Sequence, residues 1–255
     1  MLHFLRLCTL GVLIVVGPIL CSKLPAQQNA VTLNNPDFDV AGWDTIERYL
    51  QGEGINPEEV KGLELVNCNL TSVPKWISEK MPNLRELSLQ QNQISQLPDN
   101  LFNLLRLTLL NLEENQITVL PKAIGNLKRL DSLHLAHNNL KNLPSTLQQL
   151  VNLQYLDLSY NQIGTLPDLA SLSNLLVVTL NNNEDLALPR SIGQLHALQS
   201  LELKNCNLKT VPDTFEQLKA LGFLHLAGNP LAQHGSEKTW GRTELVQKFG
   251  SKVHF

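Results

Sequence analysis

The sequence predicts a repeat solenoid of the α/β class, in which short parallel strands stack side by side and short helical segments return the chain. Three observations support this prediction. Leucine accounts for 54 and asparagine for 25 of the 255 residues. Hydrophobic residues make up 43% of the chain but aromatic residues only 5%, so the apolar content is aliphatic. One pattern also returns every 22–24 residues, and a fixed period of this length is typical of stacked repeats.

The repeated pattern reads L-x-x-L-x-L-x-x-N-x-[LI]. Its clearest copies are LRELSLQQNQI, LTLLNLEENQI, LDSLHLAHNNL and LQYLDLSYNQI, which begin at Leu84, Leu107, Leu130 and Leu153. More degenerate copies begin at Val60, Leu175, Leu198 and Leu221. A proline recurs in step with the pattern, at Pro74, Pro98, Pro121, Pro144, Pro167, Pro189 and Pro212. Eight copies in register predict one solenoid over residues 60–234.

This pattern resembles the leucine-rich repeat. The linker Leu-Pro-x-x-[IL]-x-x-L, seen in LPKAIGNLKRL from Leu120, is similar to the 23-residue class of bacterial repeat proteins and Ras-suppressor-like scaffolds. The resemblance covers roughly Val60 to Leu231. It implies a horseshoe with a parallel concave sheet and short helical or 3-10 segments on the convex side. It also implies a non-catalytic module that binds a protein or peptide ligand on the concave sheet.

The alternation of side chains along a strand explains why the leucines recur. In the copy that begins at Leu130, Leu133 and Leu135 share one face of the strand and point inward, whereas His134 points outward. One such strand cannot bury its leucines alone. Eight parallel strands about 4.8 Å apart bury them against one another.

The ninth position of the repeat is expected to hold the turn that ends each strand. An asparagine amide both donates and accepts hydrogen bonds, so it can pair with backbone groups that are buried in the turn. Cysteine replaces asparagine in repeats one and seven. Six strand spacings put these two cysteines about 29 Å apart, too far for a disulfide, so we expect buried thiols with a packing role. The predicted ladder is Cys68, Asn92, Asn115, Asn138, Asn161, Asn183, Cys206 and Asn229.

The segment 1–22 has the features of a secretory signal peptide. Arg6 is the only charged side chain before Lys23, and residues 7–20 are almost wholly apolar. A buried helix is the alternative for an apolar run of this length. Cys21 follows the run, which leaves a lipid anchor at Cys21 and cleavage without lipid as open alternatives. We therefore expect an exported protein, located in the periplasm, at the cell surface or in the medium.

Both ends of a solenoid need a cover. Residues 23–59 are expected to form a tether, over 23–36, and then an N-terminal helical cap in WDTIERYL, where apolar residues recur at near-helical spacing. Residues 235–255 are expected to form a C-terminal cap, with a short helix in TWGRTELVQKFG, capped by Ser236 or Thr239, and an edge strand at Val253.

Repeat six departs from the pattern. The linker from Pro167 to Leu175 is one residue short, and Asp185 stands where a Leu or Ile is expected, with Leu186 just behind it. We expect a local shift of the convex chain here. An unshifted turn with Asp185 pointing inward would contradict this expectation.

The outward positions vary between copies while the leucines stay constant. On repeats three to five these positions combine Tyr and His with acids, and Tyr is enriched at protein-binding hot spots. A solvated strand face with incidental aromatics is the alternative interpretation. The predicted ligand-binding patch, called the central patch below, consists of Leu109, Glu113, Glu114, His134, His137, Tyr155, Asp157 and Tyr160.

Two chemical interpretations of the central patch are weaker. His134, His137 and Asp157 have the side chains of a zinc site, but residues three apart on a strand face opposite sides. Ser132 or Ser159 with His134 and Asp157 would make a catalytic triad, but the sequence offers no strained elbow or oxyanion hole. We therefore expect no catalytic residues, no metal and no cofactor.

Composition excludes further classes of function. The formal charge is −3, which argues against nucleic acid as a partner. No apolar stretch reaches the roughly 18–20 residues of a membrane span. Phosphate loops and dinucleotide fingerprints are also missing from the sequence. An exported protein-binding module is the leading interpretation, and an intracellular leucine-rich repeat scaffold or signalling regulator is the alternative.

Overall fold

The computed structural model describes residues 15–16, 30–33 and 43–255. Apart from Val15–Val16, the predicted signal peptide and Cys21 lie outside the described residues. So does most of the predicted tether.

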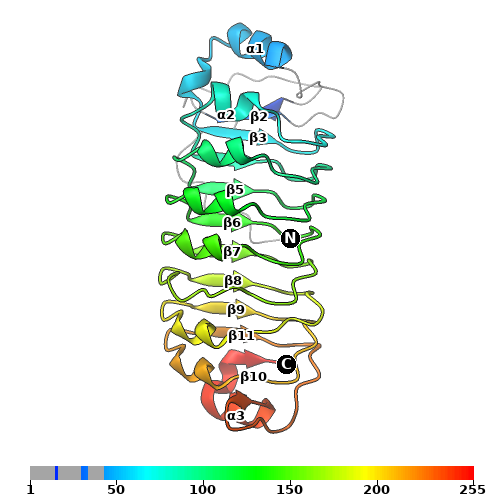
Figure 1. The fold of residues 1–255 in the computed structure, drawn as a ribbon, viewed down its shortest axis with the longest axis vertical. Helices are drawn as coiled ribbons and strands as arrows, with labels where there is room; N and C mark the ends of the chain where they lie inside the picture. Colours follow the sequence, from blue (N-terminus) through cyan, green and yellow to red (C-terminus); the bar gives the residue numbers. More distant parts are fainter. Residues whose placement is uncertain (1–14, 17–29, 34–42) are drawn as a thin grey trace.

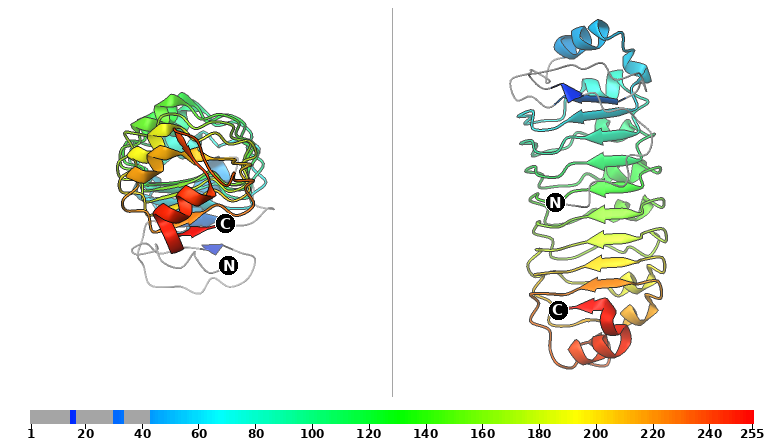
Figure 2. Two further views of the ribbon diagram at one scale, coloured as in Figure 1. Left: turned by 90° about the horizontal axis from the view of Figure 1, so that it is seen from below. Right: turned by 180° about the vertical axis from the view of Figure 1, so that it is seen from behind.

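Each of the eight repeats contributes one short strand to a parallel sheet (Figure 1). Neighbouring strands pair in sequence order, and the helical turns lie on the opposite side of each coil from the strands (Figure 2). The α/β solenoid predicted from the sequence is therefore confirmed. The repeat strands are β3 (Gly62–Leu65), β4 (Glu86–Ser88), β5 (Leu109–Asn111), β6 (Ser132–His134), β7 (Tyr155–Asp157), β8 (Val177–Thr179), β9 (Ser200–Glu202) and β11 (Phe223–His225).

The core follows from the register of this sheet. Leu110 pairs with Leu133, and Leu133 pairs with Leu156, so the inward residues of successive repeats form a continuous row. All three are fully buried. Burying a leucine side chain stabilises the fold by about 1.5–3 kcal/mol, and each coil can achieve this only with a neighbour on both sides.

The sheet continues beyond the repeats at both ends. At the N-terminal end, β2 (Ala30–Leu33) pairs with β3, and β1 (Val15–Val16) pairs with β2. Strand β2 lies within the segment that was expected to be a tether, and its Val31 is buried. At the other end β13 (Val253–His254) pairs with β11, which confirms the expected edge strand.

The return segments are single helical turns. Linkers of nine residues after the proline leave no room for a longer helix, and their 3-10 turns end at a buried leucine such as Leu127. In repeat one the linker is a residue longer and forms the one-turn α-helix α2 (Trp76–Lys80) instead. The 3-10 turns are η2 (Asp99–Asn103), η3 (Lys122–Asn126), η4 (Ser145–Gln149), η5 (Arg190–Gln194) and η6 (Asp213–Gln217).

These turns pack closely against one another. A Cβ atom at Gly125, in η3, would lie 2.9 Å from the Thr146 carbonyl oxygen of the next turn. Glycine is therefore the residue that lets η3 and η4 approach without displacing a backbone atom.

Repeat six shows the expected shift of the chain. The short linker between Pro167 and Leu175 forms no helical turn. Asp185 is exposed with a left-handed φ of +62°, and Leu186 fills the buried position behind it. The Ala187 N–H then bonds to the Gly164 carbonyl at 2.7 Å, so the chain returns to the pattern of its neighbours.

A helix covers each end of the stack (Figure 1). Helix α1 (Trp43–Gly52) buries Ile46 and Leu50 completely, and the 3-10 turn η1 (Pro57–Glu59) connects it to repeat one. None of the helices in the described part of the chain is long and apolar enough to cross a bilayer.

Helix α3 (Arg242–Phe249) covers the other end and buries Leu245 and Phe249. The expected N-cap at Ser236 or Thr239 is wrong. The helix begins after Gly241, whose N–H bonds to the Glu244 carboxylate at 2.8 Å. Instead, β12 (Thr239–Trp240) pairs with β10 (Val211–Pro212), and the 3-10 turn η7 (Gly250–Lys252) leads from α3 into β13.

Candidate functional site

The register of β5, β6 and β7 brings the strand residues of the central patch together. His134 lies opposite Asn111 on one side and Asp157 on the other. Leu109 and Tyr155 flank Ser132 in the parallel row. We call the surface formed by the third and fifth positions of the repeat strands the concave face. The strand residues of the central patch lie on this face in repeats three to five, and its other residues, Glu113, Glu114, His137 and Tyr160, follow those strands at the edge of the face.

Two histidine–tyrosine stacks run across neighbouring repeats. The rings of His134 and Tyr155 have centroids 4.8 Å apart and planes inclined by 29°. Those of His137 and Tyr160 are 4.1 Å apart and nearly parallel, at 11°. Such pairs contribute about 0.5–1.5 kcal/mol beyond their buried area and hold both rings in place. Half of the Tyr160 surface stays exposed.

The eighth residue of every repeat has a left-handed backbone. This conformation ends the strand and directs residue eight along the edge of the concave face. It is uncommon for residues with a side chain, although Asn and Gly adopt it most readily. The asparagine and glycine residues at this position, which favour this conformation, are the sequence signal that could have predicted the turn. The eight residues, with φ between +53° and +72°, are Asn67, Gln91, Glu114, His137, Tyr160, Asn182, Asn205 and Gly228.

Contacts between repeats continue along this edge. The Gln91 amide donates to the Glu114 carboxylate at 3.2 Å, and the Asn205 amide donates to Asn182 at 2.9 Å. Gln91, Asn182 and Asn205 belong to the same edge as His137 and Tyr160. Sequence reasoning did not include them in the site.

Hydrogen bonds within local turns hold the polar side chains at the fifth position of the repeats. Asp157 accepts a hydrogen bond from the Ser159 N–H at 2.9 Å, and Asn111 accepts one from the Glu113 N–H at 3.0 Å. These bonds orient one oxygen of each side chain toward its own turn. The second carboxylate oxygen of Asp157 has no hydrogen bond within the described chain.

Burial and repulsion between negative charges shift the pKa values of Glu113 and Tyr155. The pKa of Glu113 is raised by burial and by the charges of Asp157 and Glu114. Burial, followed by the charges of Asp157, Glu202 and Glu113, raises the pKa of Tyr155 to about 12, although contact with the Thr179 hydroxyl acts in the opposite direction.

His134 shifts for the same main reason. Burial lowers its pKa, which the charge of Asp157 only partly opposes. At neutral pH the patch therefore presents neutral His134 and neutral Tyr155.

The geometry does not favour the two chemical interpretations of the patch. His134 and His137 stack on different tyrosines, and no group of three His, Cys, Asp or Glu residues in the described part of the chain is arranged to hold a metal ion. Ser159 is buried, and its N–H, not its hydroxyl, bonds to Asp157.

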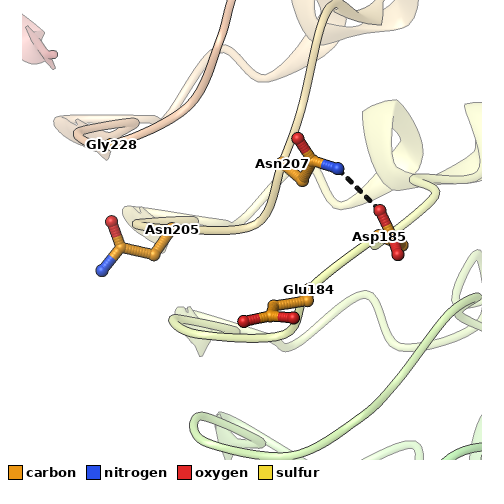
Figure 3. A pocket seen from close by; sticks show the side chains of 5 residues that line it. All are labelled: Glu184, Asp185, Asn205, Asn207 and Gly228. Carbon is orange, nitrogen blue, oxygen red and sulfur yellow. Dashed lines mark hydrogen bonds between the residues drawn. The ribbon is translucent and has the colours of Figure 1, made fainter.

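A shallow polar hollow lies outside the central patch, on the loops after β8, β9 and β11 (Figure 3). Its lining includes a hydrogen bond from the Asn207 amide to the Asp185 carboxylate, 2.6 Å long. Sequence reasoning noted Asp185 only as an irregularity. The hollow is lined by Glu184, Asp185, Asn205, Asn207 and Gly228.

The ladder residues hold neighbouring turns together. The amide of Asn138 accepts from the Ile117 N–H at 2.9 Å and donates to the Leu112 carbonyl at 2.9 Å, both in the preceding repeat. In repeat seven the Cys206 thiol donates to the Leu180 carbonyl at 3.2 Å instead. Cys206 is a buried free thiol, and burial raises its pKa.

Comparisons with known proteins agree with this architecture. A family model described as Leucine rich repeat matches residues 58–117, 82–140 and 106–163, and a second of the same description matches residues 152–175 and 197–218. No curated protein matches the chain.

One similar solved structure is the leucine-rich repeat protein LIC12759 of Leptospira interrogans. It is 33% identical, with a TM-score of 0.59, over 78% of the present chain. The chain spans 55% of the length of that structure.

Proposed function

The chain belongs to the leucine-rich repeat proteins, and we propose that it binds a protein or peptide ligand on its concave face, centred on the central patch. Leucine-rich repeat families are in general protein-interaction modules without catalytic activity. The observation that carries the proposal is the pair of histidine–tyrosine stacks, which present aromatic rings beside the carboxylates of the central patch.

The scaffold supports binding in a physical sense. The strands, the asparagine ladder and the stacked rings hold the patch residues in defined positions before any ligand arrives. A rigid surface loses little conformational entropy on association, so more of the contact energy contributes to affinity. Tyrosine combines a large apolar area with a polar hydroxyl, which is why it is frequent at hot spots.

The binding test uses substitutions on the two stacks. A protein partner would be captured from extract of the source cells, identified by mass spectrometry, purified and titrated against the full chain. We expect Tyr155→Ala and Tyr160→Ala each to weaken binding by about 1–2 kcal/mol. The matched control is Val119→Ala, because Val119 is exposed outside the central patch. Full affinity in both tyrosine variants would exclude the central patch as the binding site.

We also propose that the protein is exported. The support is the apolar run after Arg6, which has the length and position of a signal peptide core. The alternative is an intracellular scaffold or signalling regulator. Mass spectrometry of the protein from its native host distinguishes the two, because an intact N-terminal segment would contradict export. The same spectrum would show whether Cys21 carries a lipid.

A further inference from the structure

The concave face is rich in carboxylates and poor in basic side chains. Neither the third nor the fifth position of any repeat carries lysine or arginine. Over repeats two to five the seventh and eighth positions carry none either. The acidic side chains of these positions in repeats two to five are Glu86, Glu113, Glu114 and Asp157.

Within the described part of the chain, no ion pair neutralises these carboxylates. The described ion pairs, Arg190 with Asp213 and His234 with Glu244, both lie away from the patch. The pKa of Glu113 and that of Glu86 are both raised by burial and then by neighbouring carboxylates, which shows that like charges face one another here. A cation brought to this face would relieve that repulsion.

The aromatic groups lie beside the same carboxylates. Tyr155 and Asp157 are on one strand, and Tyr160 comes directly after Ser159, whose N–H bonds to Asp157. Each tyrosine has one ring face covered by a histidine that it stacks on, and Tyr160 remains half exposed. Within the described part of the chain, only one of the two Asp157 carboxylate oxygens accepts a hydrogen bond, from the Ser159 N–H. This face therefore has acceptor capacity that the described residues do not fill.

We propose, building on the proposed function, that the occupant of the central patch is an arginine-bearing cationic segment of a protein partner, whose guanidinium group lies between Glu113 and Asp157 against the tyrosine rings. A guanidinium is a donor-only planar cation that bonds carboxylates through two parallel N–H groups. It also stacks on aromatic faces, which an ammonium group does less well. Arginine thus matches both features of the patch at once.

Acid should weaken this interaction. Binding a cation needs ionised carboxylates, and Glu113 begins to take up its proton at a higher pH than an ordinary glutamate does. The charged and titratable groups around Glu113 are Glu114, Asp157, His134 and Tyr155. Protonation of His134 would add a positive charge beside the ligand, so both events reduce affinity as the pH falls.

The test titrates the full chain with a short, blocked Gly-Ser peptide that carries several arginines, beside the same peptide with citrulline at those positions. Citrulline keeps the planar shape but has no charge. We expect the arginine peptide to bind at least about tenfold more tightly at low salt, with the preference decreasing as salt screens the charges. Equal binding of the two peptides would overturn the proposal.

Paired variants locate the effect. The double variant Glu113→Gln, Asp157→Asn removes two charges with almost no change in shape, and its amide oxygen at position 157 can still accept from the Ser159 N–H. We expect it to lose the preference for arginine. The control Glu216→Gln, Glu237→Gln removes two exposed charges outside the patch and should keep affinity within about twofold.

The outcomes separate the two proposals. Retained preference in the Glu113→Gln, Asp157→Asn variant, shown to be folded by a cooperative melting curve, would overturn the cationic assignment. If the arginine peptide fails but Tyr155→Ala and Tyr160→Ala still weaken the purified protein partner, only the chemistry of the occupant is wrong. If the tyrosine variants also have no effect, the central patch itself is not the binding site.

Discussion

Repeats two to four and the junction of repeats five and six form the same kind of strand but return the chain differently. Repeats two to four have nine-residue linkers and a 3-10 turn after each proline, as in η3 and η4. The short linker that leads from repeat five into repeat six has no helical turn, and after β8 the exposed Asp185 stands where the regular repeats bury a Leu or Ile. Yet β8 pairs in register with β7 and β9, with Val178 between Leu156 and Leu201. The strand and its inward residue therefore set the stack, and the return segment adapts to it.

The same comparison explains where cysteine replaces asparagine in the ladder. Each asparagine accepts from the N–H two residues after the ladder position of the preceding repeat, as Asn138 does from Ile117. Before Cys206 that place is taken by the displaced Asp185, so an amide oxygen at position 206 would lack its usual donor. A thiol, which here donates to the Leu180 carbonyl, does not need that donor. Cys68 likewise stands in the first repeat, with no complete repeat before it.

The largest expected effect is the loss of an inward leucine in a regular repeat. Leu133→Ala should lower the free energy of unfolding by about 2–5 kcal/mol, because the cavity lies between two coils that cannot collapse independently. The matched change in repeat six, Val178→Ala, removes fewer buried atoms and should cost about 1–2 kcal/mol. Urea unfolding measures both. A larger loss for Val178→Ala would show that the irregular region controls stability.

The next effect is the loss of a ladder amide. Asn138→Ala leaves the buried Ile117 N–H without its partner and removes one of the two amide bonds to the Leu112 carbonyl, and it should cost about 1–3 kcal/mol. Cys206→Ala breaks only a weak thiol hydrogen bond and should cost about 1 kcal/mol. If the two variants unfold at the same urea concentration, the ladder residues of regular and shifted repeats contribute equally to the free energy of unfolding.

A smaller effect depends on pH. Because the pKa of folded Glu113 is raised, its contribution to stability is present below the pKa of the unfolded chain and is lost as the pH rises. Glu113→Gln should therefore stabilise the protein at pH 7 by up to about 0.5 kcal/mol, since the side chain is only partly buried and salt screens its neighbours. Thermal unfolding at pH 7 and again below pH 4 checks the sign. The gain should vanish in acid, and a gain that grows there would contradict the repulsion among the carboxylates.

A comparably small effect is expected at the exposed edge. Tyr160→Ala removes one stack with His137 and should change stability by no more than about 0.5–1 kcal/mol. Differential scanning calorimetry of the variant beside Leu133→Ala tests the contrast between the two faces of the sheet. A loss comparable to that of Leu133→Ala would make Tyr160 a structural residue and weaken its assignment to the binding site.

Much of the site could be placed from the sequence, but not how its residues meet. The repeat pattern predicted that the side chains of His134 and Asp157 point outward. The structure pairs these two residues on neighbouring strands. The repeat pattern also put Tyr155 and Tyr160 on the same repeat. The pairing of each tyrosine with a histidine of the preceding repeat was not predicted, because strand alternation allows His137 to reach the site only if the strand has already ended, and the sequence did not establish where the strand ends. The left-handed turn shows where the strand ends for His137 and Tyr160.

The sequence by itself determined the repeat length, the inward leucines, the ladder positions and the two cap helices, because each depends on a periodicity that is read within one copy or between copies. Only the tertiary structure decided the stacks, the strand added by Ala30–Leu33 and the shifts in carboxylate pKa. These depend on side chains that lie 20 or more residues apart in the chain and meet only when one coil settles on the next.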